Sequence, residues 1–188
     1  ALRLDRWVER RDNSVIPGIT TPLPAAPAEF TPAAAFDFRA AAKKIMPAVV
    51  SIDKSEAWRD MWSDRVSLVN TGTGSGVIIS PEGHILTNNH VIEGAATITV
   101  RLADGRSFEA KLIGTDPRTD LAVVKVEGNN LPVAELADSS KLEVGSWVMA
   151  AGNPLGYANT LSVGIVSSLN RSLQAGREGT LLVDAIQT

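Results

Sequence analysis

Between residues 48 and 126 the chain is a series of short hydrophobic runs that are separated by turns. These runs are Ala48–Ile52, Val66–Val69, Ser75–Ser80, Ile85–Thr87, Thr97–Leu102, Phe108–Ile113 and Leu121–Val126. Short runs rich in Val, Ile and Leu and bounded by turn residues predict β-strands, here about seven of them. Pro81-Glu82-Gly83 and Ala103-Asp104-Gly105 are turn signals, so consecutive strands are expected to pair as antiparallel hairpins. This segment therefore predicts one small closed β-barrel.

A second, shorter series of hydrophobic runs follows at Trp147–Ala151, Thr160–Leu169 and Thr180–Ile186. It predicts only about three strands. Three strands leave open edges and rarely close a barrel alone, so we expect an incomplete second barrel.

The N-terminal part of the chain has a different texture. Residues 1–13 are charged, and five prolines follow between residues 17 and 32, which is typical of an extended linker. We interpret this stretch as a spacer from a membrane tether upstream of the chain, with a tail of no consequence as the alternative. Residues 33–46 predict a short helix that ends at Pro47. The expected division is 1–35 for the charged segment and linker, 36–130 for the helix and first barrel, and 131–188 for the partial second barrel.

Composition narrows the class of protein. The 188 residues are 44% hydrophobic, which supports a real core, and the fold class we expect is all-β. The net charge of −3 with no block of like charge argues against a nucleic-acid partner or a membrane surface. With no cysteine there is no disulfide, no thiolate zinc site and no thiol nucleophile. No metal or organic cofactor is indicated.

Two residues suggest catalytic chemistry. His90 ends a strand-like run after Thr87-Asn88-Asn89, and Asp120 directly precedes the apolar run that starts at Leu121. Such a pair would supply the base and the orienting carboxylate of a serine-protease triad. The alternatives are a hydrogen-bonded structural histidine and a loop aspartate that caps the turn after Pro117. His84 is expected to be solvated, and Asp116 suits the turn role better than Asp120 does.

The glycine-rich segment 71–76 resembles a phosphate-binding loop only superficially. Such a loop must open a helix, whereas Val77-Ile78-Ile79 and the following turn predict another strand and a hairpin. The glycines are therefore expected to permit a bulge or close packing in the barrel.

The segment Gly74–Ile92 closely resembles the catalytic-histidine region of the HtrA/Deg (DegP-like) serine proteases. Residues 47–52, 119–125, 151–156 and 162–167 resemble further strands and motifs of that family, in the same order. The resemblance implies a chymotrypsin-like double β-barrel, with the triad base at His90 and the triad acid at Asp120. It also implies a homotrimer or higher homo-oligomer, for which Phe30, Phe36 and Phe38 are candidate contacts. Packing of the short helix on the first barrel would explain these rings equally well.

Two parts of the family pattern need separate comment. The family's Gly-Asn-Ser-Gly-Gly nucleophile motif is not in the printed sequence, although 182–188 resembles the strand that leads to it, so this chain alone is expected to be inactive. Ser75 and Ser162 lack the setting of a nucleophile. The insertion 55–65, with Trp58 and Trp62, corresponds to a family loop of assembly or regulation, or else is an exposed flexible loop.

The function implied is an ATP-independent serine endopeptidase of protein quality control. It would degrade unfolded or damaged polypeptides in the bacterial envelope or periplasm, without a cofactor. The alternative is a non-catalytic polypeptide-binding or chaperone-like module that uses the open strand edges of the second barrel. A nucleotide-binding protein relying on Gly72–Gly76 is the weakest alternative.

Overall fold

The computed structural model describes residues 37–59, 65–152, 160–175 and 180–188. By its internal contacts the chain divides into residues 1–36 and residues 37–188. The expected linker, Phe30, Phe36 and Trp62 therefore lie outside the described residues. Among the residues that are described, none of the helices is long and apolar enough to cross a membrane.

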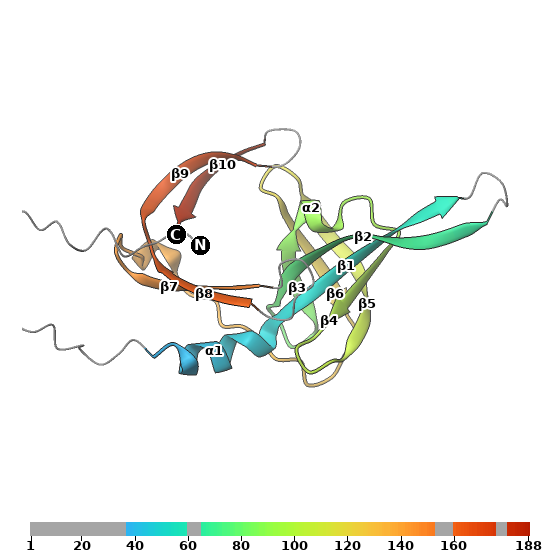
Figure 1. The fold of residues 1–188 in the computed structure, drawn as a ribbon, viewed down its shortest axis with the longest axis horizontal. Helices are drawn as coiled ribbons and strands as arrows, with labels where there is room; N and C mark the ends of the chain where they lie inside the picture. The colour runs from blue at the N-terminus through green and yellow to red at the C-terminus, as the bar shows by residue number, and fades with distance from the viewer. Residues whose placement is uncertain (1–36, 60–64, 153–159, 176–179) are drawn as a thin grey trace, which may run out of the picture. The chain divides into compact units, whose positions relative to one another are not determined.

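The first barrel is present and closed (Figure 1), as the sequence pattern predicts. Its strands are β1 (Val49–Arg59), β2 (Val66–Ile78), β3 (His84–Asn88), β4 (Thr97–Arg101), β5 (Ser107–Asp116) and β6 (Leu121–Val126). They follow one another around the barrel in the order β1-β2-β3-β6-β5-β4, and every neighbouring pair that is described is antiparallel. The strands β3 and β4 are consecutive in sequence, with the helical turn α2 (Asn89–Ile92) between them, but they are not neighbours: β3 pairs with β2 and β6, and β4 with β1 and β5.

The barrel has six strands, so the expectation of about seven is wrong. Residues 66–69 and 75–80 were expected to form two strands, but 66–78 is one continuous strand, β2. The glycine-rich stretch between them stays extended because it pairs with β1, and a register shift between Lys54 and Ser55 absorbs one extra residue. The sequence predicts a bulge in this stretch, and one is present, with Thr71 as the extra residue.

The barrel core is made of aliphatic side chains that alternate along the strands. Its fully buried members are Val50, Ile52, Ile78, Ile85, Val100, Val124 and Val126. A Cβ added to Gly76 would lie 2.7 Å from side-chain carbons of both Ile52 and Ile85. Gly76 therefore gives these two core residues the space they occupy, which is the close packing expected of the glycine-rich segment.

Beyond the bulge, β1 and β2 continue as a paired hairpin. Register contacts run out to Arg59 and Val66, so residues 55–59 of the expected 55–65 insertion are regular strand. The expectation of a flexible loop is wrong for residues 55–59, because the pairing of β1 with β2 continues past the barrel. Trp58 lies on this extension with 68% of its surface exposed.

The remaining strands form two separate two-stranded sheets. They are β7 (Trp147–Gly152) with β8 (Thr160–Ile165), and β9 (Ser168–Ala175) with β10 (Thr180–Gln187). The expected strand 160–169 is in fact two strands, interrupted at Val166 and Ser167, so the region has four described strands instead of three. Each sheet lacks further described neighbours, in agreement with an incomplete barrel.

The helical elements are short. The helix α1 (Arg39–Ile45) begins later than predicted, and Pro47 lies within a 3₁₀ turn, η1 (Met46–Ala48); a second 3₁₀ turn, η2 (Ser139–Lys141), precedes β7. Proline is tolerated at the first turn of a helix, so the chain can pass through Pro47 into β1. The Phe38 ring lies against Trp147 of β7, with 6.0 Å between centroids. Phe38 thus packs on β7 within the chain.

Candidate active site

The pairing of β3 with β6 brings the two candidate residues together. In this register Asn88 at the end of β3 lies opposite Leu121 at the start of β6. After β3 the chain continues into α2, which carries His90, and Asp120 directly precedes β6. Two residues that are 30 positions apart in sequence are therefore neighbours because two strands end at the same edge of the barrel. His90 lies in a helical turn just past the strand, not inside a strand.

Asp120 adopts an uncommon backbone conformation. Its φ is 56°, in the left-handed region that aspartate tolerates better than most residues. Its main-chain carbonyl accepts hydrogen bonds from the Asn89 N–H and from the Asn88 side-chain amide, both at 3.0 Å. These bonds hold the backbone of Asp120 against the start of α2 and offset the conformational cost.

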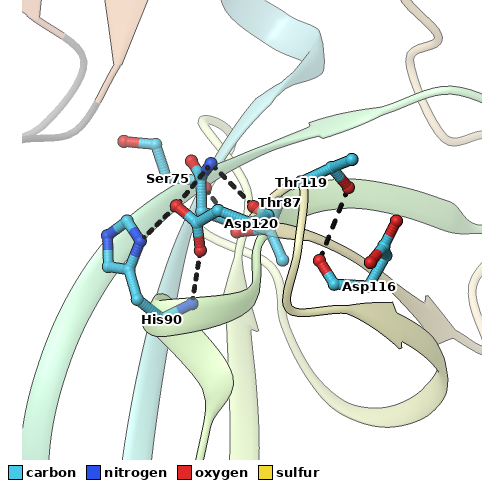
Figure 2. A network of polar contacts seen from close by, with 7 residues as sticks. Ser75, Thr87, His90, Asp116, Thr119 and Asp120 are labelled. Carbon is cyan, nitrogen blue, oxygen red and sulfur yellow. Dashed lines mark hydrogen bonds and ion pairs between the residues drawn. The ribbon is translucent and has the colours of Figure 1, made fainter. Parts of the chain in front are cut away.

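The Asp120 carboxylate is bonded to His90 at two points (Figure 2). Oδ2 lies 2.7 Å from Nδ1 of the His90 ring, and Oδ1 accepts the main-chain N–H of His90 at 2.9 Å. The amide of Asn88 lies 3.3 Å from Oδ2. The carboxylate therefore fixes both the ring and the backbone of the residue that it orients.

The contacts decide which ring nitrogen carries the proton. A carboxylate only accepts hydrogen bonds, so Nδ1 must be the donor and Nε2 of the neutral ring keeps its lone pair. The Asp120 side chain is 17% exposed, whereas that of His90 is 62% exposed. The arrangement is a held carboxylate behind an accessible imidazole, which can act as a general base through Nε2.

Asp116 has the turn role that the sequence assigned to it. Its carboxylate accepts the Arg118 N–H at 3.0 Å, and the Thr119 hydroxyl donates to its main-chain carbonyl at 3.4 Å. Hydrogen bonding from Thr119 and then from the Arg118 backbone holds the pKa of Asp116 below its ordinary value. Asp116 therefore shapes the turn, and Asp120 is the aspartate that bonds to His90.

Sequence reasoning did not identify the residues that support this pair. Asn88 donates to Asp120 twice, and the buried Thr87 donates its hydroxyl to the Ser75 carbonyl at 2.8 Å, tying β3 to β2 (Figure 2). The signal in the sequence that could have identified Thr87 and Asn88 was their position just before His90. His84, expected to be solvated, is half-buried, and its Nδ1 lies 2.7 Å from the Ser80 hydroxyl.

Ser75, whose carbonyl accepts the Thr87 hydroxyl, borders this arrangement (Figure 2). Ser75 is on β2, and Ser162 is on β8, paired with Ala150. Within the part of the chain that the structure describes, no three His, Asp or Glu side chains gather as metal ligands would.

Comparisons with known proteins identify the family of the chain. Residues 74–188, more than half of the chain, match the family described as "Trypsin-like peptidase domain". The chain belongs to the trypsin-like peptidase family. The family match contains both His90 and Asp120.

Relatives place this trypsin-like chain in the HtrA/Deg group. It is 57% identical over 100 residues to a "Probable periplasmic serine endoprotease DegP-like" of Marinomonas sp. (strain MWYL1), covering 53% of this chain and 21% of the relative. It is 56% identical over 101 residues to "Putative serine protease HhoB" of Synechocystis sp. (strain ATCC 27184 / PCC 6803 / Kazusa), covering 54% and 24%. The chain thus spans less than a quarter of the length of these two curated relatives.

Solved structures lead to the same group. The chain superposes on "HtrA-type protease AlgW with tripeptide" with a TM-score of 0.64 and 34% identity, covering 78% of this chain and 49% of that one. The HtrA/Deg resemblance seen in the sequence motifs is therefore confirmed, and so is the trypsin-like fold. The periplasmic names of several relatives also agree with the expected location in the bacterial envelope.

Proposed function

We propose that His90 and Asp120 are the general base and the orienting carboxylate of a serine endopeptidase. The observation that carries this proposal is the double attachment of Asp120 to His90, at ring Nδ1 and at the main-chain N–H, behind an exposed ring. A structural histidine has no need of an accessible Nε2, and a turn aspartate would bond to its own loop. The third member is proposed to be a serine of the full-length protein in the family's glycine-flanked motif.

The chemistry follows from the tautomer. Nε2 of His90 takes the proton of the attacking hydroxyl as its oxygen forms a bond to the scissile carbonyl carbon. The resulting imidazolium keeps its Nδ1–H bond to Asp120, whose negative charge stabilises it. His90 then gives the proton to the leaving amine as the peptide C–N bond breaks. Water repeats the sequence on the acyl-enzyme and releases the acid product.

The biological setting is proposed from the resemblance to the HtrA/Deg family. The substrates are unfolded or damaged polypeptides in the bacterial envelope, and the protein acts as a homotrimer or higher homo-oligomer. The division expected from the sequence gives residues 36–130 the base and the carboxylate, and 131–188 the other side of the cleft. Sedimentation analysis of the full-length protein would contradict the oligomer if it showed only monomer.

The proposal is tested in the full-length protein that carries these residues. Cleavage of casein and of a short peptide is compared for wild type, His90→Ala, Asp120→Asn and the control His84→Ala. His84 is the other histidine of the chain and bonds to Ser80, away from Asp120. Asp120→Asn is expected to lower kcat by about 10⁴-fold, because an amide does not hold the productive tautomer. His84→Ala should keep kcat close to that of wild type.

Two outcomes would count against the proposal. Casein cleavage by a folded His90→Ala protein would remove His90 from the chemistry. Absence of cleavage by folded, oligomeric wild type, with binding of unfolded polypeptide retained, would favour the non-catalytic binding module. A polypeptide limited to the printed 188 residues is expected to leave casein intact, since the nucleophile motif is not in that sequence.

A further inference from the structure

The helical turn that carries His90 is too short to hold its own shape. The helix α2 has only four residues, a single turn, and it ends with a hydrogen bond from the Glu93 N–H to the Asn89 carbonyl at 2.9 Å. A single turn fixes several backbone dihedrals for one bond and is unstable in isolation. The position of His90 must therefore be set by contacts from outside the turn.

Asp120 supplies these contacts at the start of the turn, and Lys54 of β1 supplies one at its end. The Lys54 ammonium donates to the Glu93 carbonyl at 2.7 Å. The last carbonyls of a helix have no partner inside the helix, and a lysine side chain can satisfy one of them. The turn is thus held at both ends.

The Lys54 side chain is itself held in place. It is only 17% exposed, and its ammonium lies 3.1 Å from the Glu56 carboxylate. The Thr71 hydroxyl donates to the same Glu56 oxygen at 3.0 Å. The Lys54 stem runs over Gly72, where a Cβ would lie 3.4 Å from its carbons. A half-buried lysine whose ammonium has two acceptors has a defined position, unlike a solvated lysine.

We propose that Lys54 is a positioning residue for His90, acting through the Glu93 carbonyl at the end of α2. This inference rests on the proposed function of His90 as the base. Lys54 does not contact the His90 ring in this arrangement; it fixes the turn from which the ring projects. Without the ammonium the end of the turn is released, and Nε2 loses its place relative to the nucleophile.

The test compares three variants of the full-length protein. Lys54→Met keeps the stem and removes the donor, and Lys54→Arg keeps a positively charged donor. Lys125→Met is the matched control, since Lys125 is also a half-buried strand lysine of the barrel, paired with Glu127 at 3.1 Å. For each variant kcat and KM for a peptide substrate are measured, together with hydrogen exchange at the Glu93 and Val124 amides.

Lys54→Met is expected to lower kcat by about 10- to 100-fold with KM within about twofold, because an error of about 1 Å in a catalytic group costs on the order of 10²-fold. Exchange at the Glu93 amide should rise at least about tenfold, while exchange at Val124 in the core stays unchanged. Lys54→Arg should recover most of the lost kcat, and Lys125→Met should match wild type.

The outcomes separate this inference from the proposed function. Unchanged kcat and unchanged Glu93 exchange in Lys54→Met would overturn the inference while leaving His90 as the base. Faster exchange at Val124 as well would also overturn it, because the loss would then come from the whole barrel. If His90→Ala stays active, the proposed function fails, and the Glu93 exchange rate still decides whether Lys54 holds the turn.

Discussion

The close approach of β2 to the helical turn of His90 leads to a sharp prediction about Gly74. A Cβ added at Gly74 would lie 2.6 Å from both methyl carbons of Val91, the residue after His90, and 3.2 Å from its Cβ. The optimal separation of two carbons is about 3.5–4.0 Å, so Gly74→Ala forces a shift of about 1 Å. The crowded neighbour is a branched side chain next to its backbone, so α2 has to move.

The size of the effect follows from two opposing terms. Overpacking of this kind costs about 1–3 kcal/mol of unfolding free energy, and replacing glycine by alanine returns about 0.4–1 kcal/mol by restricting the unfolded chain. The net loss should be about 1–2 kcal/mol, which leaves the protein folded at room temperature. The kcat should fall more severely, by up to about 10²-fold, since the displaced turn carries the base.

The assay is a double-mutant cycle in the full-length protein. Gly74→Ala, Val91→Ala and the double variant are compared by peptide hydrolysis and by urea denaturation. Val91→Ala removes the two methyl groups that the new Cβ would meet, so the double variant should recover most of the kcat lost by Gly74→Ala. Gly114→Ala on β5 is the control, because a Cβ there would meet nothing within 4 Å.

The reasoning is refuted if the two substitutions are simply additive. Coupling between contacting residues is about 0.5–3 kcal/mol, which denaturation can resolve. A Gly74→Ala protein with wild-type kcat would mean that α2 does not depend on β2.

Two further predictions concern the barrel itself. Gly83→Ala should cost about 2–6 kcal/mol of unfolding free energy, because φ is 91° and the new Cβ would collide with the Val126 carbonyl oxygen. Gly105→Ala, with φ 90° and open space around the new Cβ, should cost only about 1–3 kcal/mol. Equal losses of unfolding free energy in urea denaturation would contradict this prediction. Hydrogen bonding by Thr119 lowers the pKa of Asp116 below 3.8, so its stabilising effect is complete above that pH and is lost as the pH falls through the lower folded value. Asp116→Asn should therefore melt below wild type at about pH 6 and converge with it in acid; a constant difference down to about pH 2 would refute the assignment.

The closed barrel could be predicted because its information is local. Alternating apolar residues between Val77 and Val126, with turn signals between them, specify strands and hairpins without knowledge of the rest of the fold. The errors in the predicted strands arose where pairing with a strand distant in sequence overrides a local residue preference. Glycines normally weaken a strand, yet β2 runs through Gly72 and Gly74 because this stretch pairs with β1.

The candidate site could be predicted in residue type but not in geometry. His90 and Asp120 stand out because a polar residue borders an apolar run in each case, and the family resemblance assigned their roles. Nothing in their spacing requires contact, since β4 and β5 lie between them in sequence and the register of β3 with β6 is set by packing. The left-handed conformation of Asp120 has no signal beyond the tolerance of aspartate for it.

The same residues that close the barrel also assemble the base and its carboxylate. Thr87 and Asn88 end β3, and through them β2 and the residue before β6 are tied to the backbone just before His90. Asp120 uses its carbonyl to hold α2 and its carboxylate to hold the imidazole, so a shift of β6 would misplace both together. A single helical turn contributes almost no stability of its own. The barrel strands therefore set the position of His90. This dependence is the reason why substitutions of Lys54 on β1 and Gly74 on β2 are expected to affect His90, although neither residue takes part in the proposed chemistry.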